Sequence, residues 1–220
     1  MIKEIINLLF PPRCIFCGSL LSIRERIEIC STCYERIPFL NGKIIRPLTG
    51  QHFDEVICLC EYNGIIRQAI VGYKFFNKAA YYRTFALLLS DKIKKMTREP
   101  NFDIIISVPL HYKKQRSRGY NQSFLISKVL SKEMGILEGS YLLSRVKYTE
   151  SQSTLSKKER LLNMENAFKV SSSKKIEGKR ILLVDDVLTT GSTLDECSKV
   201  LKSAGALEVT AVVVASGRKY

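Results

Sequence analysis

Residues 181–193 read ILLVDDVLTTGST, and this stretch decides the fold of the chain. Its four apolar residues, Ile181–Val184, predict a buried strand, and Asp185 and Asp186 stand where that strand ends. A loop of hydroxyl-bearing residues and one glycine follows, and residues 194–204 are predicted to be helical. Ligands of open α/β sheets bind at the carboxyl ends of the strands. The stretch therefore predicts a binding site as well as a fold.

The loop of this stretch has the composition of a phosphate cup. A loop rich in Gly, Ser and Thr that enters a helix presents backbone N–H groups and the positive end of the helix dipole to an anion. Gly191 lets the backbone approach the ligand closely, while the two carboxylates suit ribose hydroxyls or a hydrated Mg²⁺. Together these are the requirements of phosphoribosyl pyrophosphate (PRPP). The predicted ligands of its 5′-phosphate are Thr189, Thr190, Gly191, Ser192 and Thr193.

Two other interpretations of the stretch are weaker. It lacks the Gly-x-x-x-x-Gly-Lys-Ser/Thr pattern of a P-loop. An ordinary Asp-initiated turn before a capped helix would leave the doubled aspartate unexplained.

A second strand, predicted at residues 102–109, also leads into polar residues and then into a helix that ends near Met134. Four basic residues lie within six positions of the intervening segment: Lys113, Lys114, Arg116 and Arg118. These positive charges repel one another, and a bound anion would offset the repulsion. The predicted anion is a pyrophosphate or a nucleic-acid backbone. We expect this segment, with its turn at Gly119, to form a loop at the same sheet edge as Asp185 and Asp186. A solvated basic loop is the alternative.

Four cysteines near the N-terminus predict a metal site. Cys14-x-x-Cys17 and Cys30-x-x-Cys33 are separated by 12 residues, which is close to the spacing of a two-knuckle zinc site. Four thiolates close the coordination shell, so the zinc would be structural; an iron–sulfur cluster is the alternative. The other three cysteines, Cys58, Cys60 and Cys197, are predicted to be buried and free.

Residues 41–51 contain glycine and proline and predict a linker between a zinc-ribbon module at 1–50 and a larger domain at 51–220. In the larger domain, predicted strands at 55–62, 142–145 and 209–215 alternate with predicted helices at 65–76 and 79–96. This alternation predicts an α/β domain with a parallel-dominated sheet flanked by helices. Residues 147–168 lack clean periodicity and predict a lid in which Arg160 and Asn163 reach the site. A plain surface loop is the alternative.

The chain has 220 residues and a formal net charge of +14, which implies an acidic partner such as a nucleotide, a nucleic acid or an anionic membrane surface. Residues 1–10 are apolar on one side, but they are too short to span a bilayer and carry no cleavage pattern. We expect no transmembrane segment. The predicted location is the cytoplasm, with a peripheral position at the inner face of the membrane as an alternative.

These features occur together in one known family. The four-cysteine module, Tyr62-Asn63-Gly64, Val108-Pro109, Arg118-Gly119-Tyr120-Asn121-Gln122, Gln152, and Arg160 with Asn163 precede the stretch at 181–193 in this order. The chain resembles the ComF (competence protein F) family over nearly its whole length. The resemblance implies a type I phosphoribosyltransferase-like domain joined to a zinc ribbon, with a single metal. It also implies handling of incoming single-stranded DNA in natural transformation, with a helicase partner.

The resemblance to phosphoribosyltransferases also assigns roles to individual residues. Asp185 and Asp186 would hold the ribose hydroxyls directly or through Mg²⁺. Arg116 and Gly119 would bind PRPP, and Arg116 and the catalytic residue Arg118 would stabilise the departing pyrophosphate together with the metal. Thr189 stands where relatives that act on 6-oxopurines have an acid, which disfavours a 6-oxopurine acceptor. Independently of that resemblance, the basic residues Lys113 and Lys114 and the neighbouring aromatic residue Tyr120 are the predicted contacts of DNA.

Two hypotheses for function remain at this stage. The first is a working phosphoribosyltransferase in nucleotide metabolism with an unknown acceptor. The second is a non-catalytic protein of DNA uptake, whose pocket binds PRPP or a nucleotide while its basic surface holds DNA. A purely structural adaptor would leave the aspartate pair unexplained.

Overall fold

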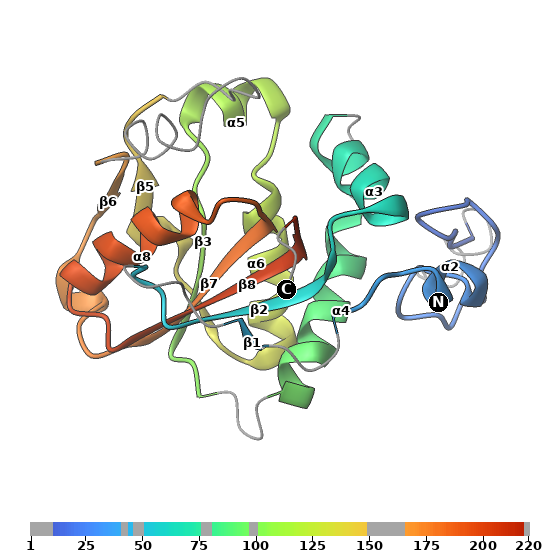
Figure 1. Ribbon diagram of the computed structural model, residues 1–220, viewed down its shortest axis with the longest axis horizontal. Helices are drawn as coiled ribbons and strands as arrows, with labels where there is room; N and C mark the ends of the chain where they lie inside the picture. The colour runs from blue at the N-terminus through green and yellow to red at the C-terminus, as the bar shows by residue number, and fades with distance from the viewer. Residues whose placement is uncertain are drawn as a thin grey trace, which may run out of the picture.

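The computed structural model describes residues 11–40, 44–45, 51–75, 81–96, 101–148 and 166–217. Its centre is a six-stranded sheet with the order β1-β2-β8-β7-β3-β4, in which β1 is the antiparallel member among the described strands (Figure 1). The strands of this sheet are β1 (Ile44–Ile45), β2 (Glu55–Glu61), β3 (Ile104–Ser107), β4 (Leu137–Glu138), β7 (Arg180–Leu188) and β8 (Glu208–Ser216). A separate antiparallel pair consists of β5 (Leu143–Arg145) and β6 (Phe168–Val170).

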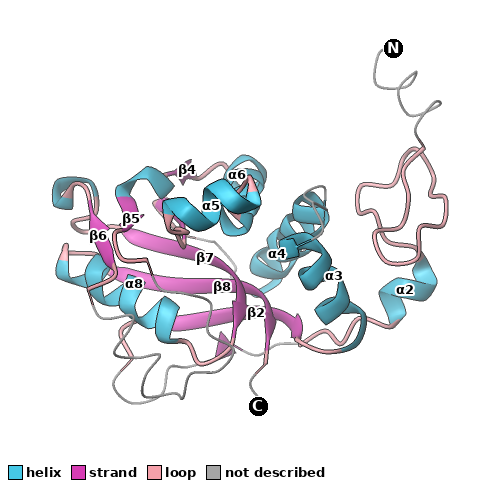
Figure 2. Ribbon diagram, turned by 90° about the horizontal axis from the view of Figure 1, so that it is seen from above, coloured by secondary structure: helices cyan, strands magenta, loops and turns pink. Residues whose placement is uncertain are grey.

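Helices cover both faces of the sheet, as Figure 2 shows. Helices α4 and α6 pack on one face and α8 on the other. The α-helices are α2 (Ser31–Glu35), α3 (Gly64–Phe75), α4 (Tyr81–Met96), α5 (Tyr112–Arg118), α6 (Gln122–Met134) and α8 (Ser192–Ser203). Two 3₁₀ turns, η1 (Ser140–Leu142) and η2 (Ser173–Lys175), flank the β5–β6 pair in the chain.

Successive residues of the central strands enter different apolar clusters, as expected for strands that are buried on both faces. In β7, Leu182 and Val184 pack with Phe85 and Leu89 of α4, whereas Ile181 and Leu183 pack with residues of α8 and of the β5–β6 pair. The apolar run 181–184 is therefore continuous because neither face of the sheet is open to water.

The N-terminal module packs on the α4 side of this sheet. Its buried residues Cys14, Ile15 and Ile37 belong to the same apolar cluster as Phe85. An ion pair joins Arg26 of the module to Glu133 at the end of α6. The cysteine module and the sheet therefore share one core.

The predicted linker at 41–51 contains a strand. Strand β1 pairs with β2, where Ile44 lies opposite Ile57, and Phe39 forms a further antiparallel bridge with Cys60. The chain leaving the cysteine module therefore runs along the edge of β2. The division at residues 50 and 51 stays a prediction.

The short strands β4 and β6 were not predicted; the predicted helices and strands of the larger domain are confirmed within the described residues, with two differences. First, β7 continues past Val184 to Leu188, because β8 runs beside it for its whole length while β3 ends at Ser107. Second, the predicted basic loop folds as helix α5. In the described part of the chain, no helix is long and apolar enough to span a membrane.

Candidate functional site

The aspartate pair lies on the part of β7 that extends beyond β3. Ser107, the last residue of β3, lies opposite Val184, so the next residue, Asp185, begins the extension. Asp185 Oδ1 accepts hydrogen bonds from Ser123 Oγ at 3.0 Å and from the Asp186 N–H at 2.9 Å. Asp186 is 9% exposed. The carboxylate of Asp185 is therefore held in one orientation by α6 and by its own backbone.

The loop after β7 folds as a phosphate cup would. Gly191 occupies the N-cap of α8 with φ 82°, a left-handed conformation that favours glycine. Thr190 Oγ1 lies 3.0 Å from Ser192 Oγ and accepts from the Ser192 N–H at 3.4 Å. Gly191 has no side chain that could accept hydrogen bonds from the first turn of α8. Backbone N–H groups of that turn can therefore donate to an anion.

The first turn of α8 also contains the carboxylate of Asp195. Its negative charge would repel a bound phosphate unless another residue interacted with the carboxylate. His52 engages it twice: its N–H donates to Asp195 Oδ1 at 2.7 Å, and its Nδ1 lies 3.0 Å from the same oxygen. These contacts give the Asp195 carboxylate partners outside the loop 189–193. Sequence reasoning missed this pair, because its two residues are 143 positions apart.

Helix α5 displays the basic residues at the end of β3. The His111 side chain caps it by accepting from the Lys113 N–H, and Gly119 ends it with φ 84°. None of its seven residues is buried, so it has no apolar stripe that would have marked it as a helix in the sequence. Lys113 and Arg116 are exposed, whereas Arg118 is half-buried.

The segment Arg118–Gln122 fixes this helix to the strands. The Asn121 amide donates to the Val108 carbonyl at 3.0 Å and accepts from the Ser123 N–H at 3.1 Å, which caps α6. Arg118 donates to Gln122 Oε1 at 2.7 Å. Three of the residues that carry the family resemblance, Arg118, Asn121 and Gln122, therefore position the basic helix beside the end of β3.

Arg145 on β5 is a site neighbour that sequence reasoning missed. Its guanidinium stands 5.4 Å from the centre of the Phe168 ring. Burial lowers the pKa of Arg145, and the nearby Cys197 and Asp185 oppose this shift. The partly buried guanidinium of Arg145 adds positive charge near the aspartate pair, where the predicted ligand is an anion. The strand is short and follows a 3₁₀ turn, so the sequence offered no sign that its arginine would lie near enough to Asp185 for the two charges to interact.

The predicted anion ligands follow or end two neighbouring strands of the sheet. Residues 189–193 directly follow β7, and Asp186 lies in the last part of that strand; Arg116, Arg118 and Gly119 follow the neighbouring strand β3. Tyr120 is half-buried against the α4-side core, and burial raises the pKa of its hydroxyl. The proposed lid residues Arg160 and Asn163 lie outside the described residues.

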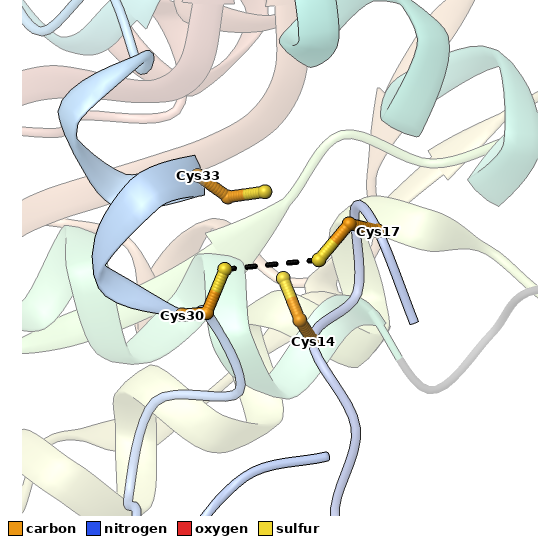
Figure 3. Close-up of side chains that lie close together, drawn as sticks. All are labelled: Cys14, Cys17, Cys30 and Cys33. Atoms are coloured by element: carbon orange, nitrogen blue, oxygen red, sulfur yellow. Dashed lines mark hydrogen bonds between the residues drawn. The ribbon is translucent and has the colours of Figure 1, made fainter. Parts of the chain in front are cut away.

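The four N-terminal cysteines form a second site (Figure 3). The sulfur atoms of Cys14, Cys17, Cys30 and Cys33 all lie within 4.8 Å of one another. Cys17 Sγ and Cys30 Sγ are 3.7 Å apart. Tetrahedral Zn–S bonds of about 2.3 Å place sulfur atoms about 3.8 Å apart, so the cluster fits zinc with little adjustment. A hydrogen bond with Ser19 lowers the pKa of Cys17 to about 6, while burial raises that of Cys33 to about 12.

The other three cysteines are buried and free, as predicted. Cys58, Cys60 and Cys197 are each 0% exposed. Burial raises the pKa of the Cys58 thiol to about 12, which makes it inert at neutral pH.

Comparison with known proteins agrees with this architecture. The family model described as phosphoribosyl transferase domain matches residues 121–220, and the one described as double zinc ribbon domain matches residues 5–58. The fold, the family models and the cysteine site thus define an α/β protein with a phosphoribosyltransferase-like domain and an N-terminal structural zinc ribbon.

Three relatives narrow the class to a family. The chain is 34% identical over 202 residues to competence protein F of Haemophilus influenzae, which covers 90% of this chain and 82% of the relative. It is 28% identical to DNA utilization protein YhgH of Salmonella typhi, with coverage of 86% and 84%. It is 26% identical to competence protein ComFC of Bacillus subtilis, with coverage of 85% and 83%. The chain belongs to the ComF family.

Proposed function

We propose that the C-terminal domain binds PRPP together with Mg²⁺. The observation that carries this proposal is the hydrogen bond from Ser123 Oγ to Asp185 Oδ1. It ties α6, the helix that directly follows the basic segment, to the aspartate pair of β7, which supports a site where a phosphate cup, two carboxylates and several cations lie at one sheet edge. No P-loop is required for this chemistry.

Each part of PRPP has its own proposed ligands. Residues 189–193 hold the 5′-phosphate. Asp185 and Asp186 hold the ribose hydroxyls directly or through Mg²⁺, since hard oxygen ligands suit that ion. Arg116, Arg118 and Gly119 hold the pyrophosphate. Arg160 and Asn163 are proposed to close over the bound ligand.

The biological role that we propose is the handling of single-stranded DNA in natural transformation. The names of the relatives from Haemophilus influenzae and Salmonella typhi, which refer to competence and to DNA utilization, support it. The net charge of +14 supports it as well. Lys113, Lys114 and Tyr120 are the proposed DNA contacts, and a helicase is the proposed partner. The proposed location is the cytoplasm, at the inner face of the membrane when the partner is engaged.

A working transferase is the second candidate, because the aspartate pair and the two arginines supply what the reaction needs. In phosphoribosyl transfer, the bond from ribose C1 to pyrophosphate breaks, positive charge develops on the sugar and negative charge on the leaving group. Asp185 and Asp186 would offset the first charge and Arg116 and Arg118 the second. Thr189 cannot act as a general base, so the acceptor would have to be a good nucleophile already.

Calorimetric titration of PRPP with Mg²⁺ tests the proposal. We expect binding by the zinc-loaded protein and its loss in the double variant Asp185→Asn, Asp186→Asn. The matched control is Asp91→Asn with Glu177→Gln, which also removes two negative charges and leaves the sheet edge intact. A folded protein that does not bind PRPP would refute the proposal. Release of pyrophosphate on addition of candidate acceptors would distinguish the transferase from the binding protein.

A further inference from the structure

Three aromatic rings meet at the start of helix α5. The His111 ring lies 4.5 Å from the ring of Tyr112 and 5.1 Å from that of Tyr148, measured between ring centres. Lys113 Nζ stands 5.2 Å from the centre of the Tyr148 ring. We call His111, Tyr112, Lys113 and Tyr148 the tyrosine cluster. Its members come from two segments that are 35 residues or more apart in the chain.

The two tyrosines are open to solvent although they pack on a buried residue. Tyr112 is 66% exposed and Tyr148 is 45% exposed, while His111 beneath them is 5% exposed. His111 is held by its capping bond to the Lys113 N–H at 3.3 Å. Burial and the positive charges of Lys113, Arg145 and Lys114 lower the pKa of His111. A fixed, neutral ring therefore supports two aromatic faces that water can reach.

Neither the core nor the PRPP site explains this arrangement. Tyr120, which follows the other end of α5, is half-buried against the core, so it offers less exposed ring surface than Tyr112 and Tyr148 do. Tyr112 and Tyr148 are absent from the described apolar clusters. Large exposed rings beside exposed lysines are instead the features of proteins that bind single-stranded nucleic acid, where bases stack on aromatic faces and cations follow the backbone.

We propose that the tyrosine cluster is a stacking platform for the bases of single-stranded DNA. Tyr112 and Tyr148 supply the stacking surfaces, and Lys113 pairs with a backbone phosphate. The basic residues Lys114 and Lys147, each next to a member of the cluster in sequence, make its charge complementary to that backbone. This inference rests on the DNA-handling part of the proposed function and is independent of PRPP binding.

The test measures the affinity of a fluorescently labelled oligo-dT for the zinc-loaded full-length protein by anisotropy, over a series of salt concentrations. Stacking on a single aromatic side chain changes affinity about five-fold or more. We expect the double variant Tyr112→Leu, Tyr148→Leu to bind at least about ten-fold more weakly, and the double variant to Phe to bind like the parent protein. Unchanged thermal unfolding and unchanged PRPP titration establish that the variants are folded.

A matched control comes from a second exposed tyrosine with a lysine over its ring. Lys175 Nζ stands 5.1 Å from the centre of the Tyr141 ring, and Tyr141 is 61% exposed. Tyr141→Leu removes the same chemistry outside the tyrosine cluster and should leave the affinity within about two-fold. An equal loss in this control would overturn the proposal, because it would make the effect a general one of surface tyrosines.

Two further probes separate stacking from charge. An oligonucleotide without bases should bind the parent protein more weakly than oligo-dT does, but should not distinguish the parent from the leucine variant. Lys113→Gln should reduce the slope of log affinity against log salt by about 0.7, whereas the leucine variant should leave it unchanged. Oligo-U in place of oligo-dT tests whether RNA uses the same platform.

The outcomes separate this inference from the proposed function. If oligo-dT binds the parent and the leucine variant equally well, the tyrosine cluster is not the platform and DNA handling stands. If oligo-dT does not bind the parent protein at 50 mM salt, both the platform and the DNA role fail. In either case, the PRPP titration tests the other part of the proposed function, which is the binding of PRPP with Mg²⁺.

Discussion

Replacing Ser123 by Ala isolates the contact that joins the two halves of the candidate site. Ser123 is 3% exposed, and its hydroxyl donates to Asp185 Oδ1 at 3.0 Å. A buried hydrogen bond to a charged group contributes about 1.5–3 kcal/mol. The Asp186 N–H still serves the same oxygen at 2.9 Å, so we expect the lower end of this range, about 1.5 kcal/mol. For a chain of this length, that loss lowers Tm by about 3–6 °C.

The assay is urea unfolding of the zinc-loaded protein in a double-mutant cycle with Asp185→Asn. The neutral amide accepts a weaker hydrogen bond than the carboxylate does. Ser123→Ala should therefore cost less in the Asp185→Asn background, with a coupling free energy of about 1 kcal/mol. Because the serine also orients the carboxylate, the affinity for PRPP with Mg²⁺ should fall by about five-fold, which is about 1 kcal/mol.

Ser127→Ala is the matched control on the same helix. Ser127 is fully buried, and its hydroxyl donates to another carboxylate, Glu138, at 3.0 Å. It should cost similar stability but neither couple to Asp185→Asn nor change PRPP affinity. Strictly additive free energies for Ser123 and Asp185, or equal PRPP affinity in the two serine variants, would refute the role assigned to Ser123.

Three other perturbations have defined outcomes. Removal of zinc by a chelator should unfold residues 11–40, because the short module depends on its metal; circular dichroism and limited proteolysis would detect this, and native spectra after complete metal loss would contradict it. Burial raises the pKa of Cys58 to about 12, above its ordinary value of 9.0, so its contribution to stability is full below pH 9 and declines as the pH rises towards 12. The unfolding free energy should therefore fall above pH 9, by up to about 1.4 kcal/mol per pH unit for this group, and less steeply in Cys58→Ala; equal slopes would contradict it. Gly139→Ala should destabilise the protein by about 1–3 kcal/mol in urea unfolding, because the new Cβ would lie 2.2 Å from Ile104 Cδ1; a variant as stable as the parent would show that Ile104 can move aside.

The parts of the fold that the sequence predicted well are those in which burial leaves a pattern. Residues 181–184 are apolar without interruption because they lie between two layers of helices, and the strand was recognisable for that reason. The cysteine cluster was equally recognisable from the sequence, because the geometry of the metal site determines the spacing of its ligands along the chain. Both features depend on residues that are close in the sequence.

The parts that the sequence did not reveal depend on distant contacts or on exposed residues. Helix α5 has no buried residue, so its periodicity carries no signal, and only its caps, His111 and Gly119, define it. Ser123 and Arg145 are ordinary residues of a helix and a strand in the sequence, and only the folded chain brings them near Asp185. Strand β1 is two residues long and exists because β2 offers it an edge.

That edge links the zinc ribbon to the phosphoribosyltransferase-type domain. The Leu40 N–H donates to the Leu59 carbonyl at 3.0 Å, and the Glu61 N–H donates to the Pro38 carbonyl at 3.0 Å. The chain leaving the ribbon therefore satisfies backbone groups of β2 that would otherwise stand open at the margin of the sheet. An uncovered edge strand invites pairing with other chains. Because α2, which carries Cys33, ends only a few residues before Pro38, the metal fixes the point from which this covering segment starts. The ribbon then has a structural purpose that does not depend on any partner: it holds in place the segment that closes the sheet.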